Sequence, residues 1–116
     1  MSNIYSILKP KSKEDIFKDV SKLDRYKLNF CLISIISKDD NEFIIKTLYD
    51  AGADINAIIT YWTPLSLAAR CECIKNIKIL IELGADINMK NGYDKTPIEL
   101  AFNIDVIKLL REHGAV

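Results

Sequence analysis

Two short motifs occur twice in this sequence at nearly the same spacing. Residues 51–56 read Ala-Gly-Ala-Asp-Ile-Asn, and Leu-Gly-Ala-Asp-Ile-Asn follows 32 residues later at 83–88. Residues 63–69 read Thr-Pro-Leu-Ser-Leu-Ala-Ala, and Thr-Pro-Ile-Glu-Leu-Ala-Phe follows 33 residues later at 96–102. A truncated copy of the first motif, His-Gly-Ala-Val, stands at 113–116. Two motifs with one common period indicate a repeat protein, in which each unit buries its apolar face against the next unit.

Each copy of the repeat predicts two short helices. Thr63 and Pro64 mark the start of the first helix, because a threonine hydroxyl accepts a backbone N–H at the helix N-terminus and proline is preset for the first helical position. A second helix is expected over 74–83, where isoleucine and leucine recur at i, i+3 and i+4. Gly84 ends this helix, since the residue after a helix commonly adopts the left-handed backbone that glycine tolerates.

This order of turn, short helix, return helix and Gly-Ala-Asp resembles the ankyrin repeat, and the resemblance covers the chain from about residue 28 onward. It implies an all-α fold, an ankyrin repeat solenoid of about three helix-turn-helix repeats. The repeats are expected at about 28–56, 57–88 and 89–116. With 116 residues, the chain is similar to the small stand-alone ankyrin repeat proteins of bacteria and large viruses.

The sequence before the repeats predicts an added N-terminal capping helix at 12–24. Ser12 and the acidic residues after it are typical of a helix N-terminus. One face of this helix is apolar and is expected to cover the end of the stack, and its residues are Ile16, Phe17, Val20 and Leu23. Residues 1–11 are interpreted as an N-terminal extension.

The repeats also depart from the regular pattern. In the first repeat we expect the inner helix at 30–37 and the outer helix at 41–49. Asp40 and Glu72 stand where the turn between the two helices usually has glycine, which predicts left-handed, strained backbone at both residues. The third repeat is about three residues short after Ala101, so its first helix should end early. Phe102 is expected to fill the space that this leaves.

Composition excludes several classes of function. Apolar residues make up 49% of the chain and charged residues 28%, which indicates one globular domain and not a disordered chain. The 16 basic and 16 acidic residues cancel, whereas nucleic-acid binders usually carry a basic excess. No apolar run approaches the ~20 residues of a membrane span. Three cysteines, an odd number, favour a reducing compartment, so we expect a cytoplasmic protein without nucleic-acid or membrane partners.

Catalytic and metal-binding patterns are weak. His113 is the only histidine, and its place at the end of the last predicted helix favours interaction with the helix dipole. Cys71 and Cys73 could begin a metal site, but zinc needs four nitrogen or sulfur ligands and the other candidates lie at opposite ends of the stack. We therefore expect no enzyme, no cofactor and no metal. The alternative, an unrecognised enzyme, would have to use His113 or Cys73.

The resemblance implies protein recognition by the turn tips and the concave face of the inner helices. The turn at 57–62 is apolar and aromatic where such turns are usually polar, which favours a partner contact. The residues predicted to bind a partner are Ile58, Ile59, Thr60, Tyr61, Trp62, Arg70, Cys71, Lys90, Tyr93, Lys95 and Asn103. The alternatives are that Trp62 packs against its own repeat and that Ile58 and Ile59 pair with the neighbouring turn.

The resulting hypothesis is a non-catalytic protein–protein interaction module. By analogy with small ankyrin repeat proteins, it is expected to act as an inhibitor, an immunity-type antagonist or an adaptor for a protein partner. The alternative is a structural protein whose apolar turn and N-terminal segment form a homodimer. We expect the chain to be a monomer or a weak homodimer.

Overall fold

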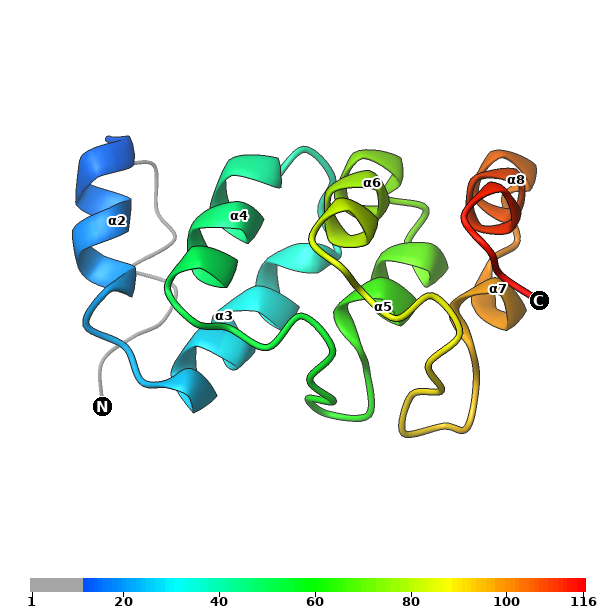
Figure 1. Ribbon diagram of the computed structural model, residues 1–116, viewed down its shortest axis with the longest axis horizontal. Coiled ribbons are helices and arrows are strands. Elements are labelled where there is room, and N and C mark those ends of the chain that lie inside the picture. The colour runs from blue at the N-terminus through cyan, green and yellow to red at the C-terminus, as the bar shows by residue number, and fades with distance from the viewer. Residues whose placement is uncertain (1–11) are drawn as a thin grey trace.

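The computed structural model describes residues 12–116, and within them seven helices follow one another along a single axis (Figure 1). The predicted extension, residues 1–11, lies outside the described residues. The helices are α2 (Lys13–Val20), α3 (Arg25–Ile36), α4 (Glu42–Asp50), α5 (Pro64–Arg70), α6 (Ile74–Glu82), α7 (Pro97–Leu100) and α8 (Ile104–Glu112). Together with the repeat pattern, this arrangement confirms the all-α solenoid of three repeats.

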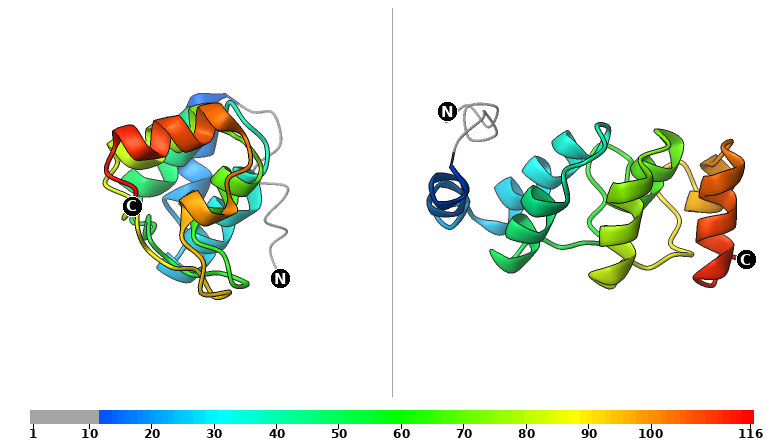
Figure 2. Two further views of the ribbon diagram at one scale, coloured as in Figure 1. Left: turned by 90° about the vertical axis from the view of Figure 1, so that its right-hand side faces the viewer. Right: turned by 90° about the horizontal axis from the view of Figure 1, so that it is seen from above.

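The helices form two rows, as the three views show (Figures 1 and 2). The inner row consists of α3, α5 and α7, and α5 packs against both of its neighbours in that row. The outer row consists of α4, α6 and α8, with α2 next to α4 at the N-terminal end. The turns that connect α4 to α5 and α6 to α7 project on the side of the inner row. We call residues 57–62 the first turn tip and residues 89–95 the second turn tip.

The inner helices α5 and α7 begin as the Thr-Pro motif predicts. At α5 the backbone N–H of Ser66 donates to the Thr63 hydroxyl, and the backbone N–H of Thr63 donates to the Ser66 hydroxyl. The N···O distance is 3.0 Å in both bonds. At α7 the N–H of Thr96 donates to Glu99 Oε1 over 3.1 Å. Each pair forms a capping box, which satisfies backbone donors that a helix start leaves unpaired.

The core lies between the two rows. Large aliphatic side chains that are fully buried come from every repeat: Leu28, Leu32, Ile36, Ile45, Leu48, Leu65, Ile77, Leu80, Val106 and Leu110. One buried polar side chain, Asn76, links the first two repeats. Its amide nitrogen donates to the carbonyls of Ile36 (3.1 Å) and Lys38 (2.7 Å), and its side-chain oxygen accepts from the N–H of Asn41 (3.1 Å). These bonds fix the spacing of α6 against the end of α3.

Asparagines also connect successive repeats near the Gly-Ala-Asp motifs. Within the first repeat, the N–H of Asp54 donates to the side-chain oxygen of Asn29 (2.7 Å). Between the first and second repeats, the N–H of Asp86 donates to the side-chain oxygen of Asn56 (2.8 Å). The N–H of Val116 continues the series by donating to Asn88 (3.2 Å). The recurring Asn of the sequence motif therefore has a structural role, since it bonds the backbone of the next repeat.

Several local predictions are confirmed. Gly84 has φ +92°, and Asp40 and Glu72 have φ +72° and +61°, so the turns between helices do use left-handed backbone. Helix α7 has only four residues, as expected for the shortened third repeat.

Three local predictions are wrong. Helix α3 begins at Arg25, before the predicted residue 30, because Asp24 accepts the N–H of Lys27 and so caps a helix start that the repeat pattern did not mark. Phe17 is 58% exposed and does not join the apolar face of α2. Phe102 is 74% exposed and fills no space, because Ala101 ends α7 in extended backbone and turns the chain outward.

A candidate protein-binding surface

The first turn tip is a tight hairpin turn without glycine. The N–H of Ile59 donates to the carbonyl of Trp62 with an N···O distance of 2.9 Å, and the N–H of Trp62 donates to the carbonyl of Ile59 with a distance of 3.0 Å. The two residues between them, Thr60 and Tyr61, have φ +49° and +75°. Positive φ at both central residues is the type I′ geometry, which costs about 1–2 kcal/mol at each residue other than glycine. The tip is therefore strained, and its shape depends on contacts outside the turn.

The second turn tip supplies that contact. The N–H of Gly92 donates to the carbonyl of Tyr61 over 2.8 Å. A Cβ atom at Gly92 would lie only 2.6–2.9 Å from the Cδ1, Cα and Cβ atoms of Tyr61, so no larger residue fits there without a shift of the tip. The close approach of these two backbones holds the strained turn in place.

Three aromatic rings meet where the two tips touch. The rings of Tyr61 and Tyr93 stack with centroids 5.2 Å apart, and Trp62 contacts Tyr93 edge-on at 5.5 Å. We call Tyr61, Trp62 and Tyr93 the aromatic cluster. Tyr61 is 61% exposed and Tyr93 is 54% exposed, whereas Trp62 is half-buried. The cluster therefore exposes two tyrosine rings to solvent, and the less exposed Trp62 packs against one of them, Tyr93.

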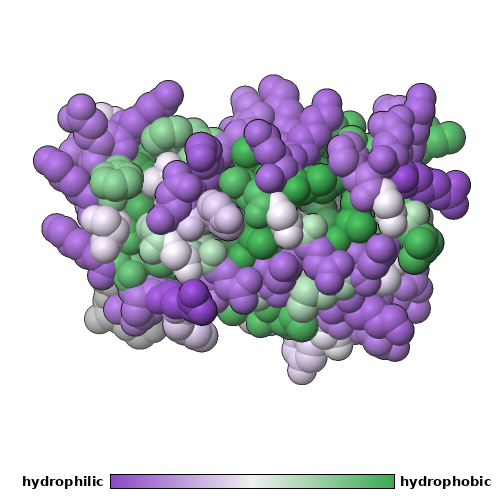
Figure 3. Space-filling view, in the orientation of Figure 1, coloured by the Kyte–Doolittle hydropathy of each residue, from purple (hydrophilic) through white to green (hydrophobic). Residues whose placement is uncertain are grey.

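Isoleucines extend this surface along the first tip. Ile58 is exposed and Ile59 is half-buried. Ile59 pairs with Trp62 inside its own turn, so the pairing of Ile58 and Ile59 with the neighbouring turn does not form. Figure 3 shows apolar and near-neutral residues at the lower edge of the molecule, where the tips project, among strongly hydrophilic residues on either side.

Asn91 sets the direction of Tyr93. Its side-chain oxygen accepts the N–H groups of Tyr93 (2.9 Å) and Lys95 (3.2 Å), and Asn91 itself is buried. This bonding closes the second tip, with Asp94 in left-handed backbone at φ +61°. The sequence signal for this role was the Asn-Gly dipeptide, which is typical of tight turns.

The lysines beside the cluster are paired with acids on their own segment. Lys90 lies 3.4 Å from Asp94, and Lys95 lies 4.0 Å from Glu99. Hydrogen bonds from the backbone and hydroxyl of Thr96 lower the pKa of Glu99, so this carboxylate stays charged. Such exposed pairs stabilise little, but each places an acid next to the lysine and so offsets its charge.

A second contact lies at the ends of the inner helices. The guanidinium carbon of Arg70 is 5.2 Å from the ring centroid of the exposed Phe102, which is a cation–π contact. Cys71, next to Arg70, is exposed. Phe102 was not among the predicted binding residues, because the repeat alignment placed it at the position of the buried Ala69.

Asn103, one of the residues predicted to bind a partner, also has a structural role. It caps α8, since its side-chain oxygen accepts the N–H groups of Asp105 (2.8 Å) and Val106 (3.3 Å). A partner contact at this residue would have to use the remaining amide group.

Two of the three cysteines, Cys31 and Cys73, are buried, whereas Cys71 is exposed. Burial raises the pKa of the Cys31 and Cys73 thiols to about 11, so both are protonated at neutral pH. The His113 ring nitrogen Nδ1 lies 3.0 Å from the carbonyl of Leu109 at the end of α8. Among residues 12–116 no three His, Cys, Asp or Glu side chains are placed to hold a metal ion. Nor does any helix in that range have the length and apolar character to cross a membrane.

Known proteins share this pattern. The family model "Ankyrin repeats (3 copies)" matches residues 32–116. Bovine ankyrin repeat and SOCS box protein 5 is 38% identical over 73 residues, covering 61% of this chain and 22% of that protein. Serine/threonine-protein kinase 12 of Arabidopsis thaliana is 35% identical over 109 residues, covering 90% of this chain and 23% of the kinase.

A viral protein is also similar. The putative ankyrin repeat protein FPV216 of fowlpox virus is 40% identical over 67 residues, covering 56% of this chain and 23% of the viral protein. The chain therefore spans less than a quarter of the length of each of these three relatives. With the family model matched over most of its length and the two rows of paired helices, the chain belongs to the ankyrin repeat family.

Proposed function

We propose that this chain binds a partner protein through the aromatic cluster and the first turn tip, and that it acts by occupying that partner. Ankyrin repeats generally serve as protein–protein interaction modules. In this proposal the chain works without catalysis, as an inhibitor or antagonist that blocks a surface of its partner. An adaptor that joins two partners is the other form of the same proposal.

The observation that carries the proposal is the exposure of two stacked tyrosines on a fixed backbone. Tyrosine, tryptophan and arginine are the residues that most often contribute ~2 kcal/mol or more each at protein interfaces. The bond between Gly92 and Tyr61 fixes the tips before a partner arrives. Binding then costs little ordering entropy, because the surface already has its bound shape.

The chemistry of this surface indicates an apolar partner patch. The lysines at the margin are already paired with Asp94 and Glu99, so the cluster offers ring faces and aliphatic carbon more than free charge. Ile58, Ile59 and Thr60 would contact the partner on one side of the cluster. Lys90, Lys95, Arg70 and Cys71 would form the rim, with Phe102 added to the predicted set.

The proposal includes a non-enzymatic role and a cytoplasmic location. The kinase relative is matched over less than a quarter of its length, so its activity is not carried over to this chain. All three cysteines are free, which suits a reducing compartment.

A capture experiment with a matched control tests the proposal. The wild type, a Tyr61→Ala/Tyr93→Ala variant and a Tyr26→Ala/Tyr49→Ala variant are each immobilised and exposed to a lysate of the source organism. Both variants lose two surface tyrosines, but Tyr26 and Tyr49 lie on α3 and α4, away from the tips. Circular dichroism first establishes that all three are folded.

We expect a specific protein to be retained by the wild type and by the control variant and to be lost with Tyr61→Ala/Tyr93→Ala. Equal retention by all three chains would contradict the proposal and move the binding site away from the tips. If none of the three chains captured a protein from the lysate, the claim of a protein partner in that organism would be contradicted.

A further inference from the structure

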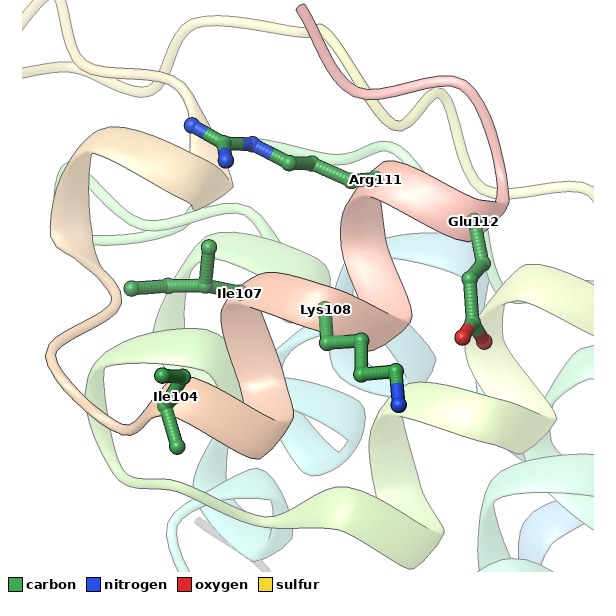
Figure 4. Close-up of a pocket in the computed structure, with 5 residues that line it drawn as sticks. All are labelled: Ile104, Ile107, Lys108, Arg111 and Glu112. Carbon is green, nitrogen blue, oxygen red and sulfur yellow. The ribbon is translucent and has the colours of Figure 1, made fainter.

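The second turn tip contains Asn91-Gly92, the only Asn-Gly pair in the sequence. Asparagine before glycine is the pair that most readily loses its side-chain amide in water, because glycine has no Cβ atom to shield its backbone nitrogen and its backbone bends freely. The other asparagines precede residues with side chains. Asn103, for example, precedes the β-branched Ile104 in the first turn of α8 (Figure 4). Residue type therefore marks Asn91 as the reactive asparagine of this chain.

The reaction needs only these two residues and water. The backbone nitrogen of Gly92 loses its proton and attacks the Cγ atom of Asn91, and the new C–N bond closes a five-membered succinimide ring. The bond between Cγ and Nδ2 breaks, and the leaving nitrogen takes up that proton and departs as ammonia. Water then opens the ring at one of its two carbonyls, which leaves aspartate or isoaspartate in place of the asparagine.

Both reacting groups are held by hydrogen bonds while the two tips touch. The N–H of Gly92 donates to the carbonyl of Tyr61 with an N···O distance of 2.8 Å. Because this bond stabilises the N–H form, the nitrogen loses its proton less readily and stays directed at the first turn tip. The side-chain oxygen of Asn91 accepts the N–H groups of Tyr93 and Lys95, which fixes the amide that would be attacked.

The same region also has two features that favour its opening. Asn91 is 5% exposed, and its Nδ2 atom has no hydrogen-bond partner among residues 12–116. An unpaired buried donor is unfavourable, so separation of the tips lowers the free energy of this group by giving it access to water. Thr60 and Tyr61 add the strain of left-handed backbone, which separation relieves.

We propose that Asn91 is a deamidation site that is controlled by the contact between the two turn tips. The pair is protected while the N–H of Gly92 is bonded to Tyr61, and the ring closes when the tips separate. Gly92 is exposed, so water reaches the ring that forms. Because ammonia is lost, a molecule that has reacted does not return to its original state.

Either product disturbs the aromatic cluster. In isoaspartate the main chain runs through the former side chain, which adds a methylene before Gly92 and displaces its nitrogen from Tyr61. In aspartate a charged oxygen replaces the buried Nδ2 atom, and burial of a charge without a partner is costly. A loss of partner binding after deamidation rests on the proposed function, whereas the reaction itself does not.

Mass spectrometry with peptide mapping tests the reaction. The wild type, Tyr61→Gly and Tyr61→Pro are incubated at neutral pH, and the wild type is also incubated in urea as the unfolded reference. Both variants lose the tyrosine ring. Glycine keeps the left-handed backbone and the position of the carbonyl, whereas proline, with φ fixed at about −65°, does not. Circular dichroism establishes which variants are folded.

We expect Asn91 to deamidate at least about tenfold more slowly in the folded wild type and in Tyr61→Gly than in the unfolded chain, and Tyr61→Pro to approach the unfolded rate. Asn103 is the internal control and should stay unmodified. Equal rates in folded and unfolded wild type would overturn the proposal. A rate in Tyr61→Pro as slow as in the wild type would overturn it as well. So would fast reaction in Tyr61→Gly, because the ring and not the bond to the carbonyl would then protect Asn91.

Thr60→Asn replaces Tyr61→Pro if the proline variant does not fold. Asparagine favours the geometry of the first turn tip, so the reaction at Asn91 should slow further. A faster reaction would contradict control by the tips.

The effect on the surface is measured on the deamidated chain, which ion exchange separates by its added negative charge. Its near-ultraviolet circular dichroism, which reports the packing of tyrosine and tryptophan, should be weaker than that of the unreacted chain. An unchanged spectrum would overturn the claimed effect on the cluster. A weaker spectrum with undiminished capture of a partner would support the modification site and contradict the proposed function.

Discussion

The amide of Gly92 donates a hydrogen bond of 2.8 Å to the carbonyl of Tyr61, and this bond joins two successive turn tips of the solenoid. Tyr61 sits in left-handed backbone, which a residue with a side chain tolerates poorly. The neighbouring repeat therefore stabilises a turn that the local sequence alone would disfavour. The aromatic cluster stands on this junction, so the proposed binding surface depends on contact between repeats.

Gly92→Ala tests that dependence. The added Cβ would meet the backbone and side chain of Tyr61 at 2.6–2.9 Å, so the two tips must separate. We expect a loss of about 1–3 kcal/mol in the free energy of unfolding, as for other overpacked sites. Urea denaturation measures it. An unfolding curve that overlays that of the wild type would show that the tips are not in close contact in solution.

Thr60→Asn tests the strain in the first turn tip. Asparagine tolerates left-handed backbone better than a β-branched residue and favours type I′ turns. We expect the free energy of unfolding to rise by about 0.5–1 kcal/mol, because the strain at φ +49° is partly relieved. Thermal unfolding compared with the wild type gives the sign. A lower midpoint would mean that the Thr60 side chain has stabilising contacts that outweigh the strain.

Asn76→Leu tests the buried polar link between the first two repeats. The substitution leaves the carbonyl of Ile36 and the N–H of Asn41 without their partner and removes one of the two bonds to the carbonyl of Lys38, which keeps the Asn41 side chain. Because such groups keep the full cost of desolvation, we expect a loss of about 2–4 kcal/mol in the free energy of unfolding. Lys78→Ala, exposed on the same helix, is the control and should change stability by less than about 0.5 kcal/mol. Equal effects of the two substitutions would contradict the assigned role.

The buried thiols predict how stability depends on alkaline pH. Burial raises the pKa of Cys31 and Cys73 from 9.0 to about 11, and Asp39 adds to the shift at Cys73. A raised folded-state pKa contributes stability that is complete below pH 9 and is lost as the pH rises toward 11, because the unfolded thiols ionise first. Urea denaturation at pH 8 and pH 10.5 should show this loss. The loss should be smaller in Cys31→Ala/Cys73→Ala, and an identical loss in the variant would contradict this explanation.

Local patterns in the sequence were sufficient to predict much of the fold. Thr63-Pro64 and Gly84 act within a few residues of their own position, so the start of α5 and the end of α6 follow from residue type. The early start of α3 was missed although Asp24 is a good helix cap. The repeat period placed the boundary of the first repeat, and that repeat has no Thr-Pro motif to correct it.

The geometry of the surface could not be predicted in this way. Tyr61 and Gly92 are far apart in sequence, and no local pattern shows that their backbones touch. The apolar character of the first tip did predict an unusual turn, but not that Tyr93 would stack on Tyr61. The exposure of Phe102 depends on how a shortened helix leaves the stack, which a repeat alignment does not describe.

The central claim is that Tyr61 and Tyr93 carry the affinity for a protein partner. Calorimetric titration of the captured partner with Tyr61→Ala, Tyr93→Ala and the control Tyr26→Ala tests it most directly. We expect each cluster substitution to weaken binding about 30-fold, which corresponds to ~2 kcal/mol, and the control to stay within about twofold of the wild type. Affinities within twofold of the wild type for both cluster variants would contradict the account.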